Sequence, residues 1–256
     1  MSEDTWIMRG MEWDDPLRIR SWQELVNWVN EVGFLPLFKN DIPGFSAEEH
    51  VHTWSWWTGD PEQDPWEWRE IIARSHQIAY GKFFDKKAGF ISLEWLPVFA
   101  NYRRDGYDFD ARWEDGLASR REKMIMDQVT EKDKDGDTLF PDIRILSTDL
   151  KKRAGFGKGG AKNYPGITTG LQMQTYLVIT DFVHRKNKKG AEYGMPVSIL
   201  QPPEAVWGYE NVTKSYMEKP EESWDRISGR LREVFSESNE SRIIRVIGKR
   251  PGTRTV

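Results

Sequence analysis

The sequence contains no cysteine, and that absence excludes several kinds of chemistry at once. Disulfide bonds, a thiol nucleophile and zinc sites built from thiolates all require the residue that is lacking. Nothing else in the composition points to an oxidising compartment. We therefore expect a cytoplasmic protein.

Long apolar runs are also lacking, since no stretch approaches the roughly 18 apolar residues needed to span a membrane. Residues 1–15, MSEDTWIMRGMEWDD, are acidic and lack the basic start and apolar run of a signal peptide. We expect neither secretion nor membrane insertion. The 256 residues suffice for one large or two smaller domains, and 13 tryptophans supply bulky apolar side chains.

The net charge of −4 hides an uneven distribution. Between Leu150 and Gly190, nine basic residues face one acid, Asp181, so this segment carries +8 and the rest of the chain −12. The nine basic residues are Lys151, Lys152, Arg153, Lys158, Lys162, Arg185, Lys186, Lys188 and Lys189. A solvated face is one interpretation, but so large an imbalance in an acidic protein favours a polyanionic partner.

Residues 1–115 have the pattern of a mixed α and β unit packed on tryptophan and phenylalanine. Ser21 and Glu24 form a capping-box pattern that predicts a helix start, and Gly33 is placed to end that helix. A second such pattern begins at Asp64, followed by proline at the favoured first helical position. Residues 77–92 then read as strand, turn and strand.

Residues 116–201 predict a winged helix-turn-helix domain. A capping box at Ser119 opens one helix, residues 147–154 form a short second one, and residues 164–176 a third. Two apolar strands follow, joined by a basic turn, and this order is typical of the motif. We expect an α+β protein, with residues 202–256 as a C-terminal helical segment packing on the core.

A glycine-rich stretch, Ala154 to Tyr164, contains the spacing G-x-G-x-x-G found in dinucleotide-binding loops. That motif requires a strand before its first glycine and an acid about 20 residues after it. Here a helix precedes it, and Asp181 is the only acid within reach. The glycines instead favour a turn between two helices, and no nucleotide cofactor is expected.

The third predicted helix has the residue types of a DNA-reading helix. Thr168, Thr169 and Gln172 are expected on its exposed side, where glutamine pairs well with an adenine edge. The nine basic residues flank this helix or occupy the hairpin tip, where they would neutralise phosphates of double-stranded DNA. A solvated wing, or a wing packed on protein, is the alternative.

Several stretches resemble a known family: GLASRREKMIMDQV, LSTDLKKRAGFGKGGAKNYPGITTGLQMQTYLVITDF, YGKFF, GFIS and PPEAVWGYE. Together they span roughly residues 20 to 210 and resemble winged-helix DNA glycosylases of the AlkZ and YcaQ type, more closely the shorter AlkZ-related proteins. The resemblance implies tandem winged-helix units around a DNA-binding cleft. It also implies hydrolytic removal of bulky alkylated or crosslinked bases, without a metal or organic cofactor.

The sequence departs from the family at its catalytic motif, a Q-x-Q or Q-x-D in the N-terminal half. No such motif precedes residue 115, and the only Q-x-Q is Gln172 to Gln174 on the third predicted helix. Residues two apart on a helix point about 200° away from each other, so these candidates should not share one water molecule. A non-catalytic DNA-binding regulator or adaptor is therefore the alternative function.

The tryptophan-rich segment offers a candidate base pocket made of Trp56, Trp57 and Trp66, because an extruded base needs aromatic walls. Core packing explains most of these tryptophans, and carbohydrate binding is a further alternative. His50 and His52 converge only on a strand, with no third histidine near. No metal site is expected.

Overall fold

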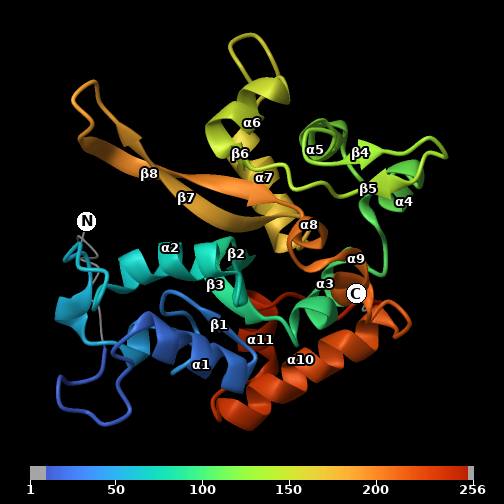
Figure 1. Ribbon diagram of the computed structural model, residues 1–256. Helices are drawn as coiled ribbons and strands as arrows, with labels where there is room; N and C mark the ends of the chain where they lie inside the picture. The colour runs from blue at the N-terminus through green and yellow to red at the C-terminus, as the bar shows by residue number, and fades with distance from the viewer. Residues whose placement is uncertain (1–9, 253–256) are drawn as a thin grey trace, which may run out of the picture.

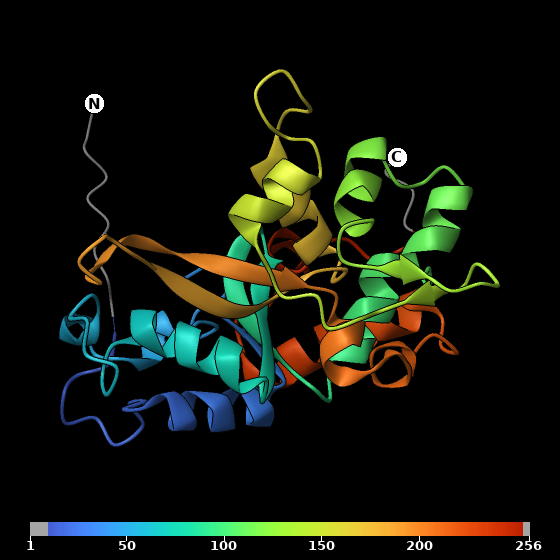
Figure 2. The same cartoon turned by 45° about the horizontal axis from the view of Figure 1, so that its top comes forward.

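The computed structural model describes residues 10–252, so residues 1–9 of the acidic start and residues 253–256 lie outside the described part. The protein is α+β, as predicted, with helices arranged around one six-stranded antiparallel sheet (Figures 1 and 2). Within residues 10–252, no helix combines the length and apolar character needed to cross a membrane.

The N-terminal half begins with two α-helices, two 3-10 turns and three strands, and two further helices follow them. In chain order these are α1 (Trp22–Val32), β1 (Phe34–Pro36), η1 (Glu48–His50), α2 (Pro65–Ser75), β2 (Ile78–Phe84) and β3 (Lys87–Ser92). A second 3-10 turn, η2 (Thr53–Ser55), lies between η1 and α2. Helices α3 (Leu96–Arg104) and α4 (Phe109–Glu114) lead to the second half.

The second half repeats this order with one insertion. Its elements are α5 (Arg120–Met126), β6 (Ile145–Leu146), α6 (Ser147–Arg153), α7 (Tyr164–Met173), β7 (Val178–Lys186) and β8 (Glu192–Gln201). The inserted segment is a small hairpin of β4 (Glu131–Lys132) and β5 (Thr138–Leu139). Four helices follow: α8 (Pro203–Trp207), α9 (Tyr209–Thr213), α10 (Pro220–Val234) and α11 (Glu240–Val246).

The strand order of the sheet is β1-β3-β2-β7-β8-β6. From either edge inward, each half places its short first strand outermost, then its last strand, then its middle strand. In each half the short first strand pairs antiparallel with the last strand, β1 with β3 and β6 with β8. Within the sheet, the strands of the two halves pair at one position, Tyr80 of β2 opposite Ile179 of β7. One continuous sheet therefore runs across residue 115, and one apolar core contains residues from both halves.

The end signals in the sequence mark where several elements begin and end. The Ser21 hydroxyl accepts from the Glu24 amide at the start of α1, and the Ser119–Glu122 capping box opens α5. Gly33 ends α1 at φ 98°, where an added Cβ would lie 2.6 Å from the Trp95 ring. The glycine-rich stretch forms the turn between α6 and α7, with Gly155 at φ 74°.

A buried ion pair joins the C-terminal helices to the rest of the core. The Arg104 guanidinium donates to the Glu204 carboxylate at 2.5 Å, and also to the Thr175 carbonyl and Tyr216 hydroxyl. Burial alone would lower the pKa of Arg104, but the Glu204 carboxylate raises it above its ordinary value. The buried Arg104 charge is thus paired with the Glu204 carboxylate and donates further hydrogen bonds to two neighbours.

Glu204→Gln is expected to destabilise the fold by about 3–5 kcal/mol, because it leaves Arg104 charged, buried and without its counterion. The matched control is Glu218→Gln, which breaks the exposed Glu218–Arg226 pair and should cost less than about 1 kcal/mol. Urea unfolding followed by circular dichroism measures both. Equal losses in the two variants would contradict this account of the core.

Candidate nucleic-acid interface

A groove of about 640 Å³ lies where the two halves of the sheet meet. Its wall residues come from α2, β2, β3, β7, β8 and the start of α6, so neither half builds it alone. They are Phe38, Trp66, Arg69, Tyr80, Lys82, Lys86, Lys87, Ala88, Ser147, Thr148, Ile179, Phe182, Arg185, Met195, Pro196, Val197 and Ser198. As far as the described residues form them, the groove walls combine aromatic and aliphatic side chains with five cations, and they include no carboxylate and no glutamine.

One wall of the groove is a stack of an arginine between two aromatic rings. The Arg69 guanidinium carbon lies 3.8 Å from the ring centre of Trp66 and 4.4 Å from that of Phe182. Arg69 is 3% exposed, and its Nε has no hydrogen-bond partner among the described residues. The stack joins α2 to β7 through cation–π contacts between Arg69 and both rings.

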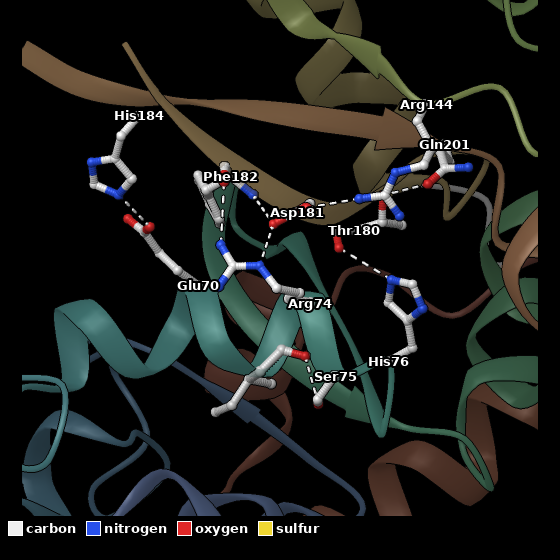
Figure 3. A network of polar contacts seen from close by, with 11 residues as sticks. Glu70, Arg74, Ser75, His76, Arg144, Thr180, Asp181, Phe182, His184 and Gln201 are labelled. Atoms are coloured by element: carbon white, nitrogen blue, oxygen red, sulfur yellow. Dashed lines mark hydrogen bonds and ion pairs between the residues drawn. The ribbon is translucent and has the colours of Figure 1, made fainter. Parts of the chain in front are cut away.

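The Arg69 charge is balanced by Glu70, which also holds the β7–β8 hairpin. Arg69 donates to one Glu70 oxygen at 3.0 Å. His184 Nε2 lies 2.9 Å from the other oxygen (Figure 3). Glu70 is only 5% exposed, so these two partners supply the interactions that a buried carboxylate needs. His184 also lies 3.4 Å from Glu192 on β8, which extends the contact to both strands of the hairpin.

Asp181 forms the second link between α2 and β7. Its carboxylate accepts from Arg74 of α2 at 2.8 Å and from Arg144, just before β6, at 2.7 Å (Figure 3). Next to it, the Thr180 hydroxyl donates to Gln201 at 2.6 Å. Asp181 therefore ties three elements of the sheet region together rather than facing a ligand.

The mouth of the groove carries four exposed cations, Lys82, Lys86, Lys87 and Arg185. None of them forms an ion pair with an acid in residues 10–252. The strand that carries Arg185 continues into the hairpin tip, and Ser147 and Thr148 are the first residues of α6. The groove thus opens between the two basic segments that the sequence singled out.

The basic residues predicted to contact DNA all lie at the surface, on three neighbouring segments. Lys151, Lys152 and Arg153 are exposed on α6, Lys158 and Lys162 on the turn after it, and Arg185, Lys186, Lys188 and Lys189 at the hairpin tip. These nine residues are called the basic surface below. Figure 1 shows both the hairpin and the α6–α7 turn projecting from the upper half of the molecule.

The predicted exposure of α7 is wrong for two of its three polar residues. Thr168 is 6% exposed and Gln172 3% exposed, while Thr169 is half-buried. The reason is that α7 packs against β2 of the other half: the Gln172 side-chain oxygen accepts from the Lys82 amide at 3.0 Å. The Thr168 hydroxyl donates to the Tyr164 carbonyl of its own helix.

The two glutamines of the Q-x-Q sequence point to different neighbours, as the helical geometry predicts. Gln172 bonds to Lys82 on β2, whereas the Gln174 amide donates to the Glu122 carboxylate of α5 at 3.1 Å. The contacts that the two side chains make outside α7 therefore lie on two different elements, β2 and α5.

The predicted tryptophan pocket is not assembled as expected. Trp66 lines the groove, but Trp56 is buried behind it, with its ring centre 5.6 Å from that of Phe38. Trp57 is 57% exposed, has a left-handed φ of 57° and does not line the groove. His50 instead contacts the Gly44 carbonyl, and residues 10–252 contain no cluster of three or more potential metal ligands.

Sequence reasoning missed the groove residues Arg69, Tyr80, Lys82 and Phe182. A signal existed in β2, where Tyr80 and Lys82 alternate with buried neighbours and therefore share one face. The sequence contains no signal for the pairing of Tyr80 with Ile179. This pairing places two residues that are 99 positions apart in the sequence side by side at the floor of the groove. Burial raises the pKa of Tyr80 to about 12, so this floor residue stays a neutral phenol at physiological pH.

Comparison with known proteins matches a family model described as AlkZ related, over residues 19–248. The chain belongs to the AlkZ-related family. No curated protein and no solved structure matches the chain. The matched region covers both halves of the sheet, α10 and α11, so the groove of this AlkZ-related protein lies inside the family region.

The half-buried Glu67 of this AlkZ-related protein gives a pH-dependent prediction. Burial, and then the neighbouring carboxylates of Glu70 and Asp64, raise the pKa of Glu67 above its ordinary value. A carboxylate with a raised folded pKa destabilises the fold above that pKa, and the fold gains stability as pH falls through it. Glu67→Gln should therefore raise the melting temperature at pH 7.

The gain should disappear below about pH 4, where glutamate is protonated in both the folded and unfolded states. Differential scanning fluorimetry from pH 3.5 to pH 8 tests this, with Glu62→Gln on the exposed turn before α2 as the matched control. A gain that is the same at pH 3.5 and pH 7 would show that burial of the Glu67 charge is not its cause.

Proposed function

We propose that this protein binds double-stranded DNA through the basic surface and the groove beside it, and that each half of the sheet is a winged-helix unit. The observation that carries the proposal is an aromatic groove with four cations at its mouth that have no acidic partner in residues 10–252, opening between two further basic segments. Membership of the AlkZ-related family supports an interaction with DNA. The residues of the basic surface are those proposed to contact the phosphates.

The order of elements supports two winged-helix units. In each half a helix, a short strand, a short helical segment and a longer helix precede a hairpin, and the short strand pairs with the last hairpin strand. This pairing, together with the hairpin, is what a winged helix-turn-helix requires. The second unit contributes the β7–β8 hairpin as its basic wing.

The two longer helices are poorly suited to reading base edges. Helix α2 uses Glu70 and Arg74 to hold β7, and α7 has buried Thr168 and Gln172. Contacts to DNA therefore come from exposed lysines and arginines, which neutralise phosphates without reading sequence. We propose binding of low sequence specificity and strong salt dependence.

Base excision is a second candidate, favoured by the kinship of the family with DNA-repair glycosylases. Hydrolysis of an N-glycosidic bond needs a group that activates water, such as a carboxylate or, in the family that the sequence resembles, a glutamine. The groove walls, as far as the described residues form them, provide neither, and Tyr80 stays protonated. The groove therefore supports binding better than hydrolysis, and a non-catalytic DNA-binding role is the function that the geometry supports best.

Replacing Lys186, Lys188 and Lys189 together by glutamate is expected to weaken binding of a 20-base-pair duplex at least tenfold at low salt, because three attractive charges become repulsive toward phosphates. The slope of log K against log salt should fall by about one for each phosphate that the variant leaves without a lysine. Fluorescence anisotropy measures both quantities. The control has three glutamates at Lys134, Lys214 and Lys249, exposed lysines outside the basic surface, and an equally large effect in that control would remove the hairpin from the interface.

Incubation with duplex DNA alkylated at purine nitrogens should give binding without base release. Abasic sites are scored by alkali cleavage and gel electrophoresis, with DNA incubated without protein as the control. Alkali-labile sites that form with the wild-type protein would establish the excision candidate and overturn the non-catalytic one.

A further inference from the structure

His184 on β7 lies between two carboxylates that come from different elements. Its Nε2 is 2.9 Å from Glu70 of α2, and its Nδ1 is 3.4 Å from Glu192 of β8 (Figure 3 shows the contact with Glu70). An ionised carboxylate only accepts hydrogen bonds, whereas a neutral imidazole has one N–H group and one acceptor nitrogen. Only the protonated ring can therefore donate to both acids, and a neutral ring turns a lone pair toward one of them.

This histidine lies where the hairpin changes its pairing. The register of β7 against β8 shifts between Val183 and Arg185, directly around His184. An irregularity of this kind interrupts the ladder and bends the strand. Arg185 and Lys186 follow it on β7 and begin the exposed basic end of the hairpin, which projects from the rest of the molecule (Figure 1). His184 thus lies at the base of the segment that carries these cations.

The charged groups around the ring come from both elements that pack on β7. Helix α2 supplies the ion pair of Arg69 with Glu70, and Glu67 lies within electrostatic reach of His184. Strand β8 supplies Glu192. With a neutral ring, three carboxylates face the single cation of Arg69, and protonation of His184 adds a second cation. The His184 side chain is 32% exposed, so it exchanges protons with solvent.

We infer that His184 is a proton-dependent latch: its protonated ring holds the basic end of the β7–β8 hairpin against α2, and loss of the proton releases that end. Histidine side chains ordinarily change charge between about pH 5 and pH 8. A hairpin end that is held in place presents its cations already ordered, whereas a released end must be ordered on binding, which lowers affinity. This consequence for DNA rests on the proposed function, but the latch itself requires no DNA.

Hydrogen–deuterium exchange of residues 183–193 at pH 5.5 and pH 8 tests the latch without DNA. Protection is calculated against an unstructured chain at the same pH, which removes the direct effect of pH on exchange. Wild-type protection should be about tenfold higher at pH 5.5, the effect of one hydrogen bond to a charged group. His184→Gln should show the low protection at both pH values, because the amide stays neutral.

Glu192→Gln should give the opposite result. Its amide can donate to Nδ1 of a neutral His184 ring while the Nε2–H donates to Glu70, so protection should stay high at both pH values. This gain at pH 8 distinguishes a latch from a histidine that merely stabilises the fold. Equal wild-type protection at the two pH values, or a difference that survives in His184→Gln, overturns the inference and leaves the proposed DNA binding standing.

The matched control is His52→Gln, since the His52 ring contacts those of Trp13 and Trp54 outside the hairpin. This variant should keep the wild-type difference in protection.

Fluorescence anisotropy with a paired 20-base-pair duplex, at one salt concentration and the same two pH values, tests the consequence for DNA. The wild type and His52→Gln should bind several-fold more tightly at pH 5.5, and this ratio should fall toward one in His184→Gln and Glu192→Gln. A ratio that both of these variants keep overturns the link between the latch and DNA. No binding at either pH overturns the proposed function, whereas the exchange experiment still decides the latch.

Discussion

The buried carboxylate of Glu70 is the constraint on which the groove depends. A charged group at 5% exposure is stable only with partners, and Glu70 takes one from its own helix and one from the hairpin, Arg69 and His184. This requirement fixes β7 against α2. Arg69 is held by the same carboxylate, and its guanidinium group lies between Trp66 and Phe182, where the three side chains form one wall of the groove.

The same pairing explains why two halves with one order of elements have different roles. In the first half, α2 uses its polar face to hold β7, and Asp181 completes the link through Arg74 and Arg144. In the second half, the hairpin keeps its outer end exposed and basic. The two halves share one order of elements but differ in role. The first half holds the β7–β8 hairpin in place, the second half exposes the basic end of that hairpin, and the groove lies between the halves.

Local signals predicted much of the fold, whereas the site depended on contacts distant in sequence. Capping residues such as Ser21 and Ser119 act within one helical turn, so α1 and α5 could be located from the sequence. Strands β1 and β6 are three and two residues long, too short for any periodicity, and their pairing partners lie more than 50 residues away. The hairpin and its basic tip were predicted, but not that α2 holds the hairpin in place.

Helix α7 shows why exposure was harder to predict than helicity. A periodic pattern identifies the face that packs within its own unit, here the face of Leu171, and leaves the remaining residues as apparent surface. In this protein β2 of the other half covers a second face, where Gln172 replaces solvent as the partner of the Lys82 amide. Polar residues there satisfy the backbone of a neighbouring strand, so polarity alone could not separate an internal contact from a ligand contact. Within residues 10–252, the lysines of the β2–β3 turn and the hairpin tip are exposed and form no ion pair with an internal acid, so their charges stay available to a ligand.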